Sequence, residues 1–317
     1  MSAAHFADRL AHAIRQTGNP VCVGLDPRWE SLPAPIRERA QAGPGSPAEQ
    51  RARGYEEFCL RIIDAIAGLV PIIKPQVAFF EECGPAGMAV LWRVMRAARQ
   101  AGLLVIADAK RGDIGTTAEA YAQAYLGDSG TGPGQGGVDA LTINPYMGRD
   151  TLVPFLETAR AGGCGVYILV RTSNPGAGTF QDLTDTTGRK LFQQVAALVE
   201  ELALADLGSC GLGSAGAVVG ATYPRELAEL RQAMPHVPLL IPGYGTQGAG
   251  AADVAPAFGP QGIGAVVNSS RGIIFAHARK DLVGRFAPDQ WEDAVRLATR
   301  QMIDDLAPHC RPTPSNA

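Results

Sequence analysis

The chain has 317 residues, of which 46% are hydrophobic and 19% charged, as is typical of a globular protein with a substantial core. The formal net charge is -3 and the pI is near 6.0, which argues against a nucleic-acid partner because such partners select basic surfaces. No apolar run approaches the roughly 18 residues that cross a bilayer, so we expect no membrane partner either.

The first segment, about residues 3–17, spaces Phe6, Leu10, Ala13 and Ile14 at helical intervals between charged residues. This pattern predicts an amphipathic helix. The segment lacks the apolar block of a signal peptide, and we therefore expect a cytoplasmic protein.

Short apolar runs alternate with amphipathic stretches along the rest of the chain. Most runs are continuous, as in strands covered on both faces of a parallel sheet. We expect strands at 21–26, 70–75, 103–109, 139–144, 165–171, 215–221, 238–243 and 263–269. We expect helices at 50–69, 85–101, 115–126, 187–204, 224–233 and 288–306. This order predicts an α/β protein, a single-domain (β/α)8 TIM barrel over 1–317. A doubly wound sheet is the alternative, although "GLDPRW" after the first strand is not its glycine fingerprint.

Three segments are expected to lie outside this scaffold. Residues 31–49 contain Pro and Gly at the density of a loop, and residues 127–137, "GDSGTGPGQGG", have the composition of a flexible insertion. The tail at 308–317 is polar and rich in Pro, which predicts a flexible end. The six cysteines show no C-x-x-C spacing, and we expect no metal site.

Polar residues follow nearly every predicted strand. Because the carboxyl ends of barrel strands meet at one face, these residues are expected to converge on one site. They are Asp26, Lys74, Asp108, Lys110, Asn144, Arg171, Thr172 and Ser173, followed by the loops "PGYGTQG" (242–248) and "NSSRG" (268–272).

The distribution of lysine supports a chemical role for this face. The chain has only four lysines, Lys74, Lys110, Lys190 and Lys280, and two of them stand at strand ends. An ammonium group donates a proton, whereas a guanidinium almost never does. The two loops near the C-terminus indicate a phosphate site, since glycine-rich backbone, Gln247 and Arg271 all offer donors to an anion.

The motif "DAKRGDIG" (108–115) resembles the D-x-K-x-x-D-I motif of the orotidine 5'-phosphate decarboxylase family. The segments "GLDPR", "KPQVAFFE", "TSNPGA", "PGYGTQG" and "NSSRG" follow the order and spacing of that family, over residues 24–272. The resemblance is greatest to the longer bacterial branch. It implies a dimeric (β/α)8 barrel that converts orotidine 5'-phosphate to UMP and CO2, in pyrimidine biosynthesis, without metal or organic cofactor.

The resemblance also implies roles for individual residues. Lys74, Asp108, Lys110 and Asp113 would form an alternating charge network, with Asp113 supplied across a homodimer interface. Asp108 would lie beside the departing carboxylate, and Lys110 would stabilise the carbanion and protonate C6. The substrate contacts it implies are Asp26 and the partner's Thr117 for the ribose, Ser173 for the pyrimidine, and Pro242, Gln247 and Arg271 around the phosphate.

Several alternatives remain open from the sequence alone. Asp113 and "TTAE" (116–119) also suit the start of a helix, Asp108 and Lys110 suit a structural ion pair, and Asp26 suits a turn. Alternative functions are a Mg²⁺-dependent 3-keto-L-gulonate 6-phosphate decarboxylase or hexulose phosphate synthase, a Schiff-base aldolase, and a non-catalytic barrel that binds a nucleotide phosphate.

Overall fold

Eight parallel strands form a closed barrel in the computed structural model, which describes residues 4–127, 138–245, 248–259 and 261–310. The strands are β1 Val21–Leu25, β2 Ile72–Pro75, β3 Leu104–Arg111, β4 Ala140–Ile143, β5 Gly165–Arg171, β6 Ala215–Val219, β7 Leu239–Ile241 and β8 Ala265–Ser269. All eight predicted strands are confirmed. Because β1 pairs with β8 as well as with β2, the barrel is confirmed and the doubly wound alternative is wrong.

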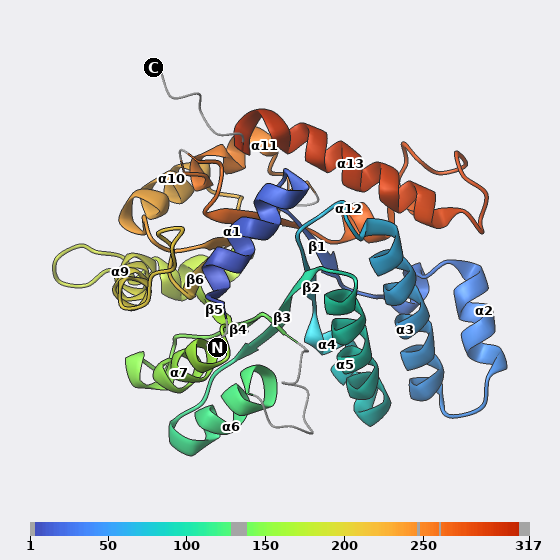
Figure 1. The fold of residues 1–317 in the computed structure, drawn as a ribbon, viewed down its shortest axis with the longest axis horizontal. Helices are drawn as coiled ribbons and strands as arrows, with labels where there is room; N and C mark the ends of the chain where they lie inside the picture. Colours follow the sequence, from blue (N-terminus) through green and yellow to red (C-terminus); the bar gives the residue numbers. More distant parts are fainter. Residues whose placement is uncertain (1–3, 128–137, 246–247, 260, 311–317) are drawn as a thin grey trace.

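Helices surround the barrel between the strands (Figure 1). Those of eight or more residues are α1 Phe6–Thr17, α2 Ala34–Ala42, α3 Pro47–Ile66, α5 Gly84–Gln100, α6 Gly115–Leu126, α7 Val153–Ala161, α9 Leu191–Leu204, α10 Pro224–Ala233 and α13 Trp291–Cys310. Shorter ones are α4 Val77–Glu81, α8 Gly178–Gln181, α11 Ala251–Val254 and α12 Arg271–Ile274. The expected helices are confirmed, and α2, α7 and the four shorter helices are additional.

The N-terminal helix α1 closes the end of the barrel opposite the strand carboxyl ends. Its apolar face, which includes Phe6, Leu10 and Ile14, packs on side chains that point into the barrel, among them Tyr167. Phe6 meets Tyr167 edge to face, with ring centroids 6.1 Å apart. A Cβ at Gly165 would lie 2.3 Å from the Phe6 ring, so this close approach requires glycine.

Two expectations about loops require correction. Residues 31–49 are not a loop throughout, because α2 lies inside the segment and α3 begins at Pro47, where Ser46 and Glu49 form a capping box. The predicted C-terminal tail begins inside a helix, because α13 continues to Cys310 and Pro308 lies in its last turn. Residues 128–137 of the predicted insertion and residues 311–317 lie outside the described part of the chain.

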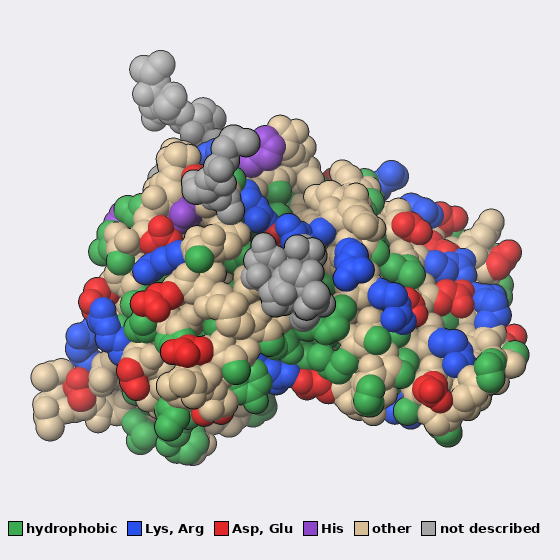
Figure 2. Space-filling model, turned by 60° about the horizontal axis from the view of Figure 1, so that its bottom comes forward, with side chains coloured by type: hydrophobic (Ala, Val, Ile, Leu, Met, Phe, Trp, Pro, Cys, Tyr) green, Lys and Arg blue, Asp and Glu red, His purple; other side chains and the backbone are tan. Residues whose placement is uncertain are grey.

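The surface carries both signs of charge. On the face drawn in Figure 2, lysine and arginine side chains are interspersed with aspartate and glutamate. Among the described residues, no helix combines the length and the apolar composition that crossing a membrane requires.

Candidate active site

The site begins with an irregularity in strand β3. Ala107 pairs with Leu141 of β4, but the next pair is Arg111 with Ile143. Three residues, 108–110, therefore stand opposite the single residue Thr142, which is a bulge in β3. Lys110 at its end has φ 49° and is the only non-glycine residue of the described chain with a positive φ. Such a conformation costs roughly 1–3 kcal/mol and is characteristic of functional sites.

The carboxylate of Asp108 is the centre of the site. Its Oδ2 lies 2.6 Å from Lys74 Nζ and 2.9 Å from Gln76 Nε2, and its Oδ1 lies 2.5 Å from Lys110 Nζ and 3.0 Å from Thr142 Oγ1. Each oxygen thus accepts one bond from an ammonium and one from a neutral donor. The structure brings together three of the four predicted charges, and both lysines contact the same carboxylate.

The charges in this group keep one another ionised. Burial by itself would raise the pKa of Asp108, but the ammonium charges of Lys74 and Lys110 hold that pKa well below its usual range. Burial would conversely lower the pKa of Lys74, and the negative charges of Asp108 and Asp26 instead raise it. At neutral pH the buried pair is therefore an ammonium and a carboxylate.

A cavity of about 410 Å³ opens above this group at the carboxyl ends of the strands. Leu169, Val218 and Leu240 give it an apolar wall opposite the charges. Five of the predicted site residues line it: Lys74, Asp108, Lys110, Ser173 and Pro242. Thr142, Thr172 and Asn174 complete the lining. The cavity thus combines an apolar wall with a few convergent polar groups, as small-molecule sites do.

Two buried oxygen atoms on or just after the neighbouring strands β1 and β8 lack a partner among the described residues. They are Oδ1 of Asp26, which follows β1, and Oδ1 of Asn268 on β8. Asn268 is only 8% exposed, and β8 pairs with β1 directly below this point. A buried acceptor without a donor is costly, so both oxygens favour a ligand that brings hydroxyl or N–H donors.

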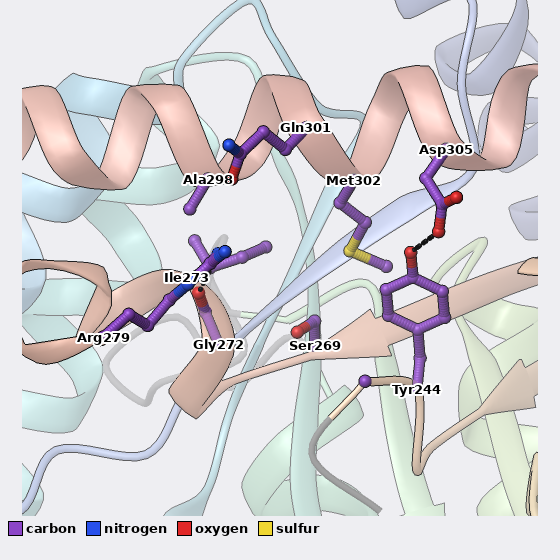
Figure 3. A pocket seen from close by; sticks show the side chains of 10 residues that line it. Tyr244, Ser269, Gly272, Ile273, Arg279, Ala298, Gln301, Met302 and Asp305 are labelled. Carbon is purple, nitrogen blue, oxygen red and sulfur yellow. Dashed lines mark hydrogen bonds between the residues drawn. The ribbon is translucent and has the colours of Figure 1, made fainter. Parts of the chain in front are cut away.

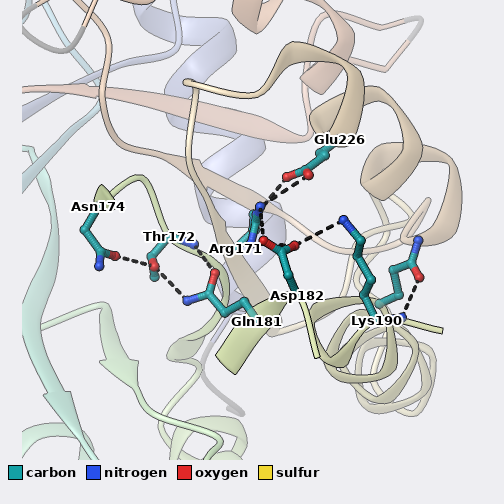
Figure 4. Close-up of polar contacts among 8 residues, drawn as sticks. Arg171, Thr172, Asn174, Gln181, Asp182, Lys190 and Glu226 are labelled. Atoms are coloured by element: carbon teal, nitrogen blue, oxygen red, sulfur yellow. Dashed lines mark hydrogen bonds and ion pairs between the residues drawn. The ribbon is translucent and has the colours of Figure 1, made fainter. Parts of the chain in front are cut away.

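The loop that carries Ser173 is fixed by Gln181 of α8. Gln181 Oε1 accepts from Thr172 N at 3.0 Å, its Nε2 donates to Thr172 Oγ1 at 2.7 Å, and Thr172 Oγ1 donates to Asn174 Oδ1 at 2.7 Å (Figure 4). This network orients the segment on both sides of Ser173.

Arg171 does not belong to the site, contrary to the ring of polar strand ends expected from the sequence. The side chain is buried and pairs with Glu226 at 2.7 Å and Asp182 at 3.3 Å, and Lys190 also reaches Asp182 (Figure 4). Its guanidinium carbon lies 4.9 Å from the ring centroids of both Phe192 and Tyr223. A register shift between Leu169 and Arg171 in the β5–β6 pairing accompanies this outward orientation. Arg171 therefore anchors the β5 loop to the surrounding helices.

Asp113 and Thr117 lie at the rim, away from Lys110. Asp113 is half-buried, and its Oδ1 accepts from Ile114 N at 2.8 Å. Within the described chain it contacts neither Lys74 nor Lys110. Thr117 is exposed on the first turn of α6. Helix α6 begins with Ile114 as its N-cap and no side-chain cap, so neither Asp113 nor "TTAE" caps it.

The loop after β7 borders the cavity through Pro242, and the loop after β8 starts beside it, because β7 pairs with β8. Pro242 leads into Gly243 and Gly245, whose φ angles of 101° and 72° suit only glycine. Arg271 is the first residue of α12 and is exposed, and its side chain forms no hydrogen bond or ion pair with any other described residue. Gln247 lies outside the described residues.

A second cavity, of about 510 Å³, separates these loops from α13 (Figure 3). The Tyr244 hydroxyl donates to the Asp305 carboxylate of α13, and Arg279 donates to the backbone oxygen of Gly272 at 3.2 Å and pairs with Asp281 at 2.7 Å. These bonds tie Tyr244 of the β7 loop to α13 and Gly272 at the start of α12 to Arg279.

Four side chains of the site were not singled out from the sequence: Gln76, Thr142, Gln181 and Asn268. Gln76 stands inside the quoted motif "KPQVAFFE" and Asn268 inside "NSSRG", so a polar residue at a strand end was the available signal. Thr142 is hidden in the apolar run of β4, where a threonine is common in any strand. Gln181 bonds to Thr172, nine residues earlier in the chain, and the hydrophobic periodicity of the sequence does not reveal such a contact.

The closed barrel, with charged side chains converging at the carboxyl ends of its strands, places the chain among (β/α)8-barrel enzymes. Comparison with known proteins narrows this class. The model of the orotidine 5'-phosphate decarboxylase / HUMPS family matches residues 19–283, and the chain belongs to this family. The family predicted from the motifs is thereby confirmed.

Relatives match over nearly their whole length. The orotidine 5'-phosphate decarboxylase of Rhodopirellula baltica is 52% identical over 305 residues, covering 95% of this chain and 98% of the relative. That of Haloarcula marismortui is 44% identical, covering 86% and 87%. The solved structure of Leishmania donovani OMP decarboxylase is 31% identical, with a TM-score of 0.70 and 96% and 97% of the two chains covered.

Proposed function

We propose that this chain decarboxylates orotidine 5'-phosphate to UMP and CO2. The observation that carries the proposal is the carboxylate of Asp108 held between the ammonium groups of Lys74 and Lys110 at the base of an apolar-walled cavity. The choice of substrate is supported by relatives named orotidine 5'-phosphate decarboxylase, which are 52% and 44% identical in sequence to this chain. The pathway it would serve is the synthesis of UMP.

The chemistry explains why fixed charges would be needed. Loss of CO2 from C6 leaves an electron pair in the plane of the ring, where the π-system does not delocalise it. Lys110 would stabilise that pair electrostatically and then deliver its proton to C6. Asp108 would face the departing carboxylate, and two like charges about 4 Å apart repel by roughly 4 kcal/mol at an effective dielectric of 20.

The other predicted residues fit parts of the same substrate. Asp26, with one buried oxygen lacking a partner, would accept from a ribose hydroxyl. Ser173 and Pro242 line the cavity and would contact the pyrimidine and the sugar phosphate. The unpaired Arg271 would bind the phosphate with Gln247. Phosphate binding far from C6 would supply energy used at the reacting carbon.

We further propose a homodimer with shared sites, in which Asp113 of the partner subunit approaches Lys110 and the partner's Thr117 approaches the ribose. The supporting observation is a set of exposed apolar side chains, here named the rim patch, in the segments that follow β3, β4 and β5. It consists of Ile114 (61% exposed), Tyr146 (77%), Met147 (43%) and Phe180 (56%). Exposed apolar surface near a carboxylate that has no ion-pair partner among the described residues suits a protein–protein interface.

The deciding experiment is a spectrophotometric assay with orotidine 5'-phosphate after dialysis against EDTA. We expect turnover to UMP at an undiminished rate. Activity that chelation abolishes and Mg²⁺ restores would instead favour a 3-keto-L-gulonate 6-phosphate decarboxylase or hexulose phosphate synthase type of enzyme. Borohydride trapping of the substrate would indicate a Schiff-base aldolase, and UMP binding without turnover would indicate a non-catalytic barrel.

A further inference from the structure

We infer that Thr142 is a positioning residue for the proposed decarboxylation, and that its hydroxyl fixes Asp108 and Lys110 relative to each other. The inference rests on the proposed function, because these are the two groups that would act on the substrate there. Thr142 lies on β4, is 1% exposed, and lines the cavity through its side chain.

The register of the barrel puts Thr142 opposite the bulge. Leu141 and Ile143, its neighbours on β4, pair with Ala107 and Arg111 of β3, so Thr142 alone faces the three residues between them. A regular ladder would send side chains two residues apart to the same face with equal spacing. In the bulge the ladder is interrupted, and another group has to fix the backbone at this point.

The hydroxyl of Thr142 supplies that group. Its oxygen accepts from the backbone N–H of Lys110 at 2.9 Å, and its proton is donated to Asp108 Oδ1 at 3.0 Å. The direction of both bonds follows from their partners, because an amide N–H only donates and a carboxylate only accepts. The other acceptor in reach, the backbone oxygen of Ala107, is farther away at 3.5 Å. One hydroxyl thus bridges the backbone of one proposed reacting group and the side chain of the other.

Lys110 has few other restraints. Its side chain is 46% exposed, and its φ of 49° is disfavoured for a residue with a Cβ. The bond to Thr142 therefore opposes relaxation of the bulge toward an ordinary strand, which would move Lys110 Nζ. Because threonine is branched at Cβ, its χ1 is restricted in a strand, and the hydroxyl direction is fixed as well.

The test compares Thr142→Val with Thr142→Ser. Valine keeps the shape and removes the hydroxyl, which leaves the Lys110 N–H unpaired and Asp108 with one donor fewer. We expect Thr142→Val to lower kcat about 10²-fold, since small displacements of reacting groups have effects of this size, while UMP affinity stays within about threefold. Thr142→Ser restores the hydroxyl and should recover kcat to within about tenfold of the unchanged chain.

A matched control is Thr299→Val. Thr299 is also fully buried, and its hydroxyl donates to the backbone oxygen of Val295 within α13, so this change tests general destabilisation and should leave kcat unchanged. Should Thr142→Val fail to fold, Thr142→Ala carries the same expected loss.

Three results would overturn the inference. They are a kcat for Thr142→Val equal to that of the unchanged chain, equal losses in Val and Ser, and a loss confined to KM and UMP affinity. Absence of turnover by the unchanged chain would instead overturn the proposed function, and the inference would fall with it.

Discussion

Among single residues, Asp108 carries the largest share of the site's organisation. Its two oxygens accept four bonds, two of them from ammonium groups. Removing any one donor leaves the buried carboxylate with fewer hydrogen bonds. Removing a lysine destabilises the site more, because a buried charge then has one opposite charge fewer. The two lysines nevertheless differ, since Lys74 is buried and Lys110 is open to the cavity.

This difference predicts the effect of Lys110→Ala. Because Lys74 still neutralises Asp108, we expect the variant to fold, while product formation falls by at least about 10⁴-fold as the proton donor is lost. Steady-state assays with orotidine 5'-phosphate measure the loss. Lys280→Ala, which removes an exposed lysine, is the control. Activity of Lys110→Ala within about tenfold of the unchanged chain would contradict the role of Lys110.

Arg271→Ala tests the phosphate site. The side chain of Arg271 forms no hydrogen bond or ion pair with another described residue, so its removal should leave stability unchanged. We expect kcat/KM to fall about 10- to 100-fold, mostly through KM, as one charged hydrogen bond to phosphate is lost. Arg225→Ala, at another exposed arginine, should leave both constants unaltered. An unchanged KM in Arg271→Ala would place the phosphate elsewhere.

At the scale of elements, the fold places chemistry at one end of the barrel and stability at the other. The β3 bulge and the β5, β7 and β8 loops shape the cavity, whereas α1 closes the opposite end on an apolar cluster. Helix α1 is also held by Asp8, whose carboxylate accepts from Ser209 N at 2.9 Å and Cys210 N at 2.7 Å in the loop before β6.

Asp8 gives the barrel a specific dependence on pH. Partial burial would raise its pKa, but the backbone N–H groups of Ser209 and Cys210 lower it to about 2, from an ordinary value of 3.8. Because the folded-state pKa is the lower one, the stabilisation is fully present above about pH 4 and is lost as the pH falls toward 2. Asp8→Asn should therefore lower the free energy of unfolding by about 1 kcal/mol at pH 7.

Urea unfolding of both chains across this range measures the effect. The difference between the unchanged chain and Asp8→Asn should shrink as the pH falls from about 4 toward about 2. Asp64→Asn, at an exposed aspartate of α3, is the control and should show no difference at any pH. A difference between the chains that stays constant with pH would mean that the Asp8 charge is not responsible.

For the molecule as a whole, the proposed homodimer makes each active site depend on both subunits. If Asp113 acts in the site of the partner subunit, Lys110→Ala and Asp113→Ala damage different halves of one site. A hybrid dimer then contains one intact site and one doubly altered site. Random mixing of the two inactive variants should restore about a quarter of the sites. The measurement is activity after unfolding the mixture and refolding it. Hybrids that form, shown by tags of different mass, and remain inactive would argue against shared sites.

The sequence determined the succession of strands and helices. Short continuous apolar runs indicate buried strands, and apolar residues at helical spacing indicate amphipathic helices, so their alternation could be predicted. It also identified the charges of "DAKRGDIG" and the glycine loops, because lysine at strand ends and glycine at left-handed positions have local causes. The helices α2 and α7 were missed since they are short, each with Pro next to its start, a residue that also marks loops.

Only the tertiary structure decided which charges meet. The bulge that places Thr142 opposite Asp108 and Lys110 arises from the pairing of β3 with β4, and pairing between strands leaves no trace in the period of either one. For the same reason Arg171 and Lys110, both at strand ends, have different surroundings. Arg171 pairs with Glu226 of α10 and with Asp182 outside the cavity, whereas Lys110 lines the cavity.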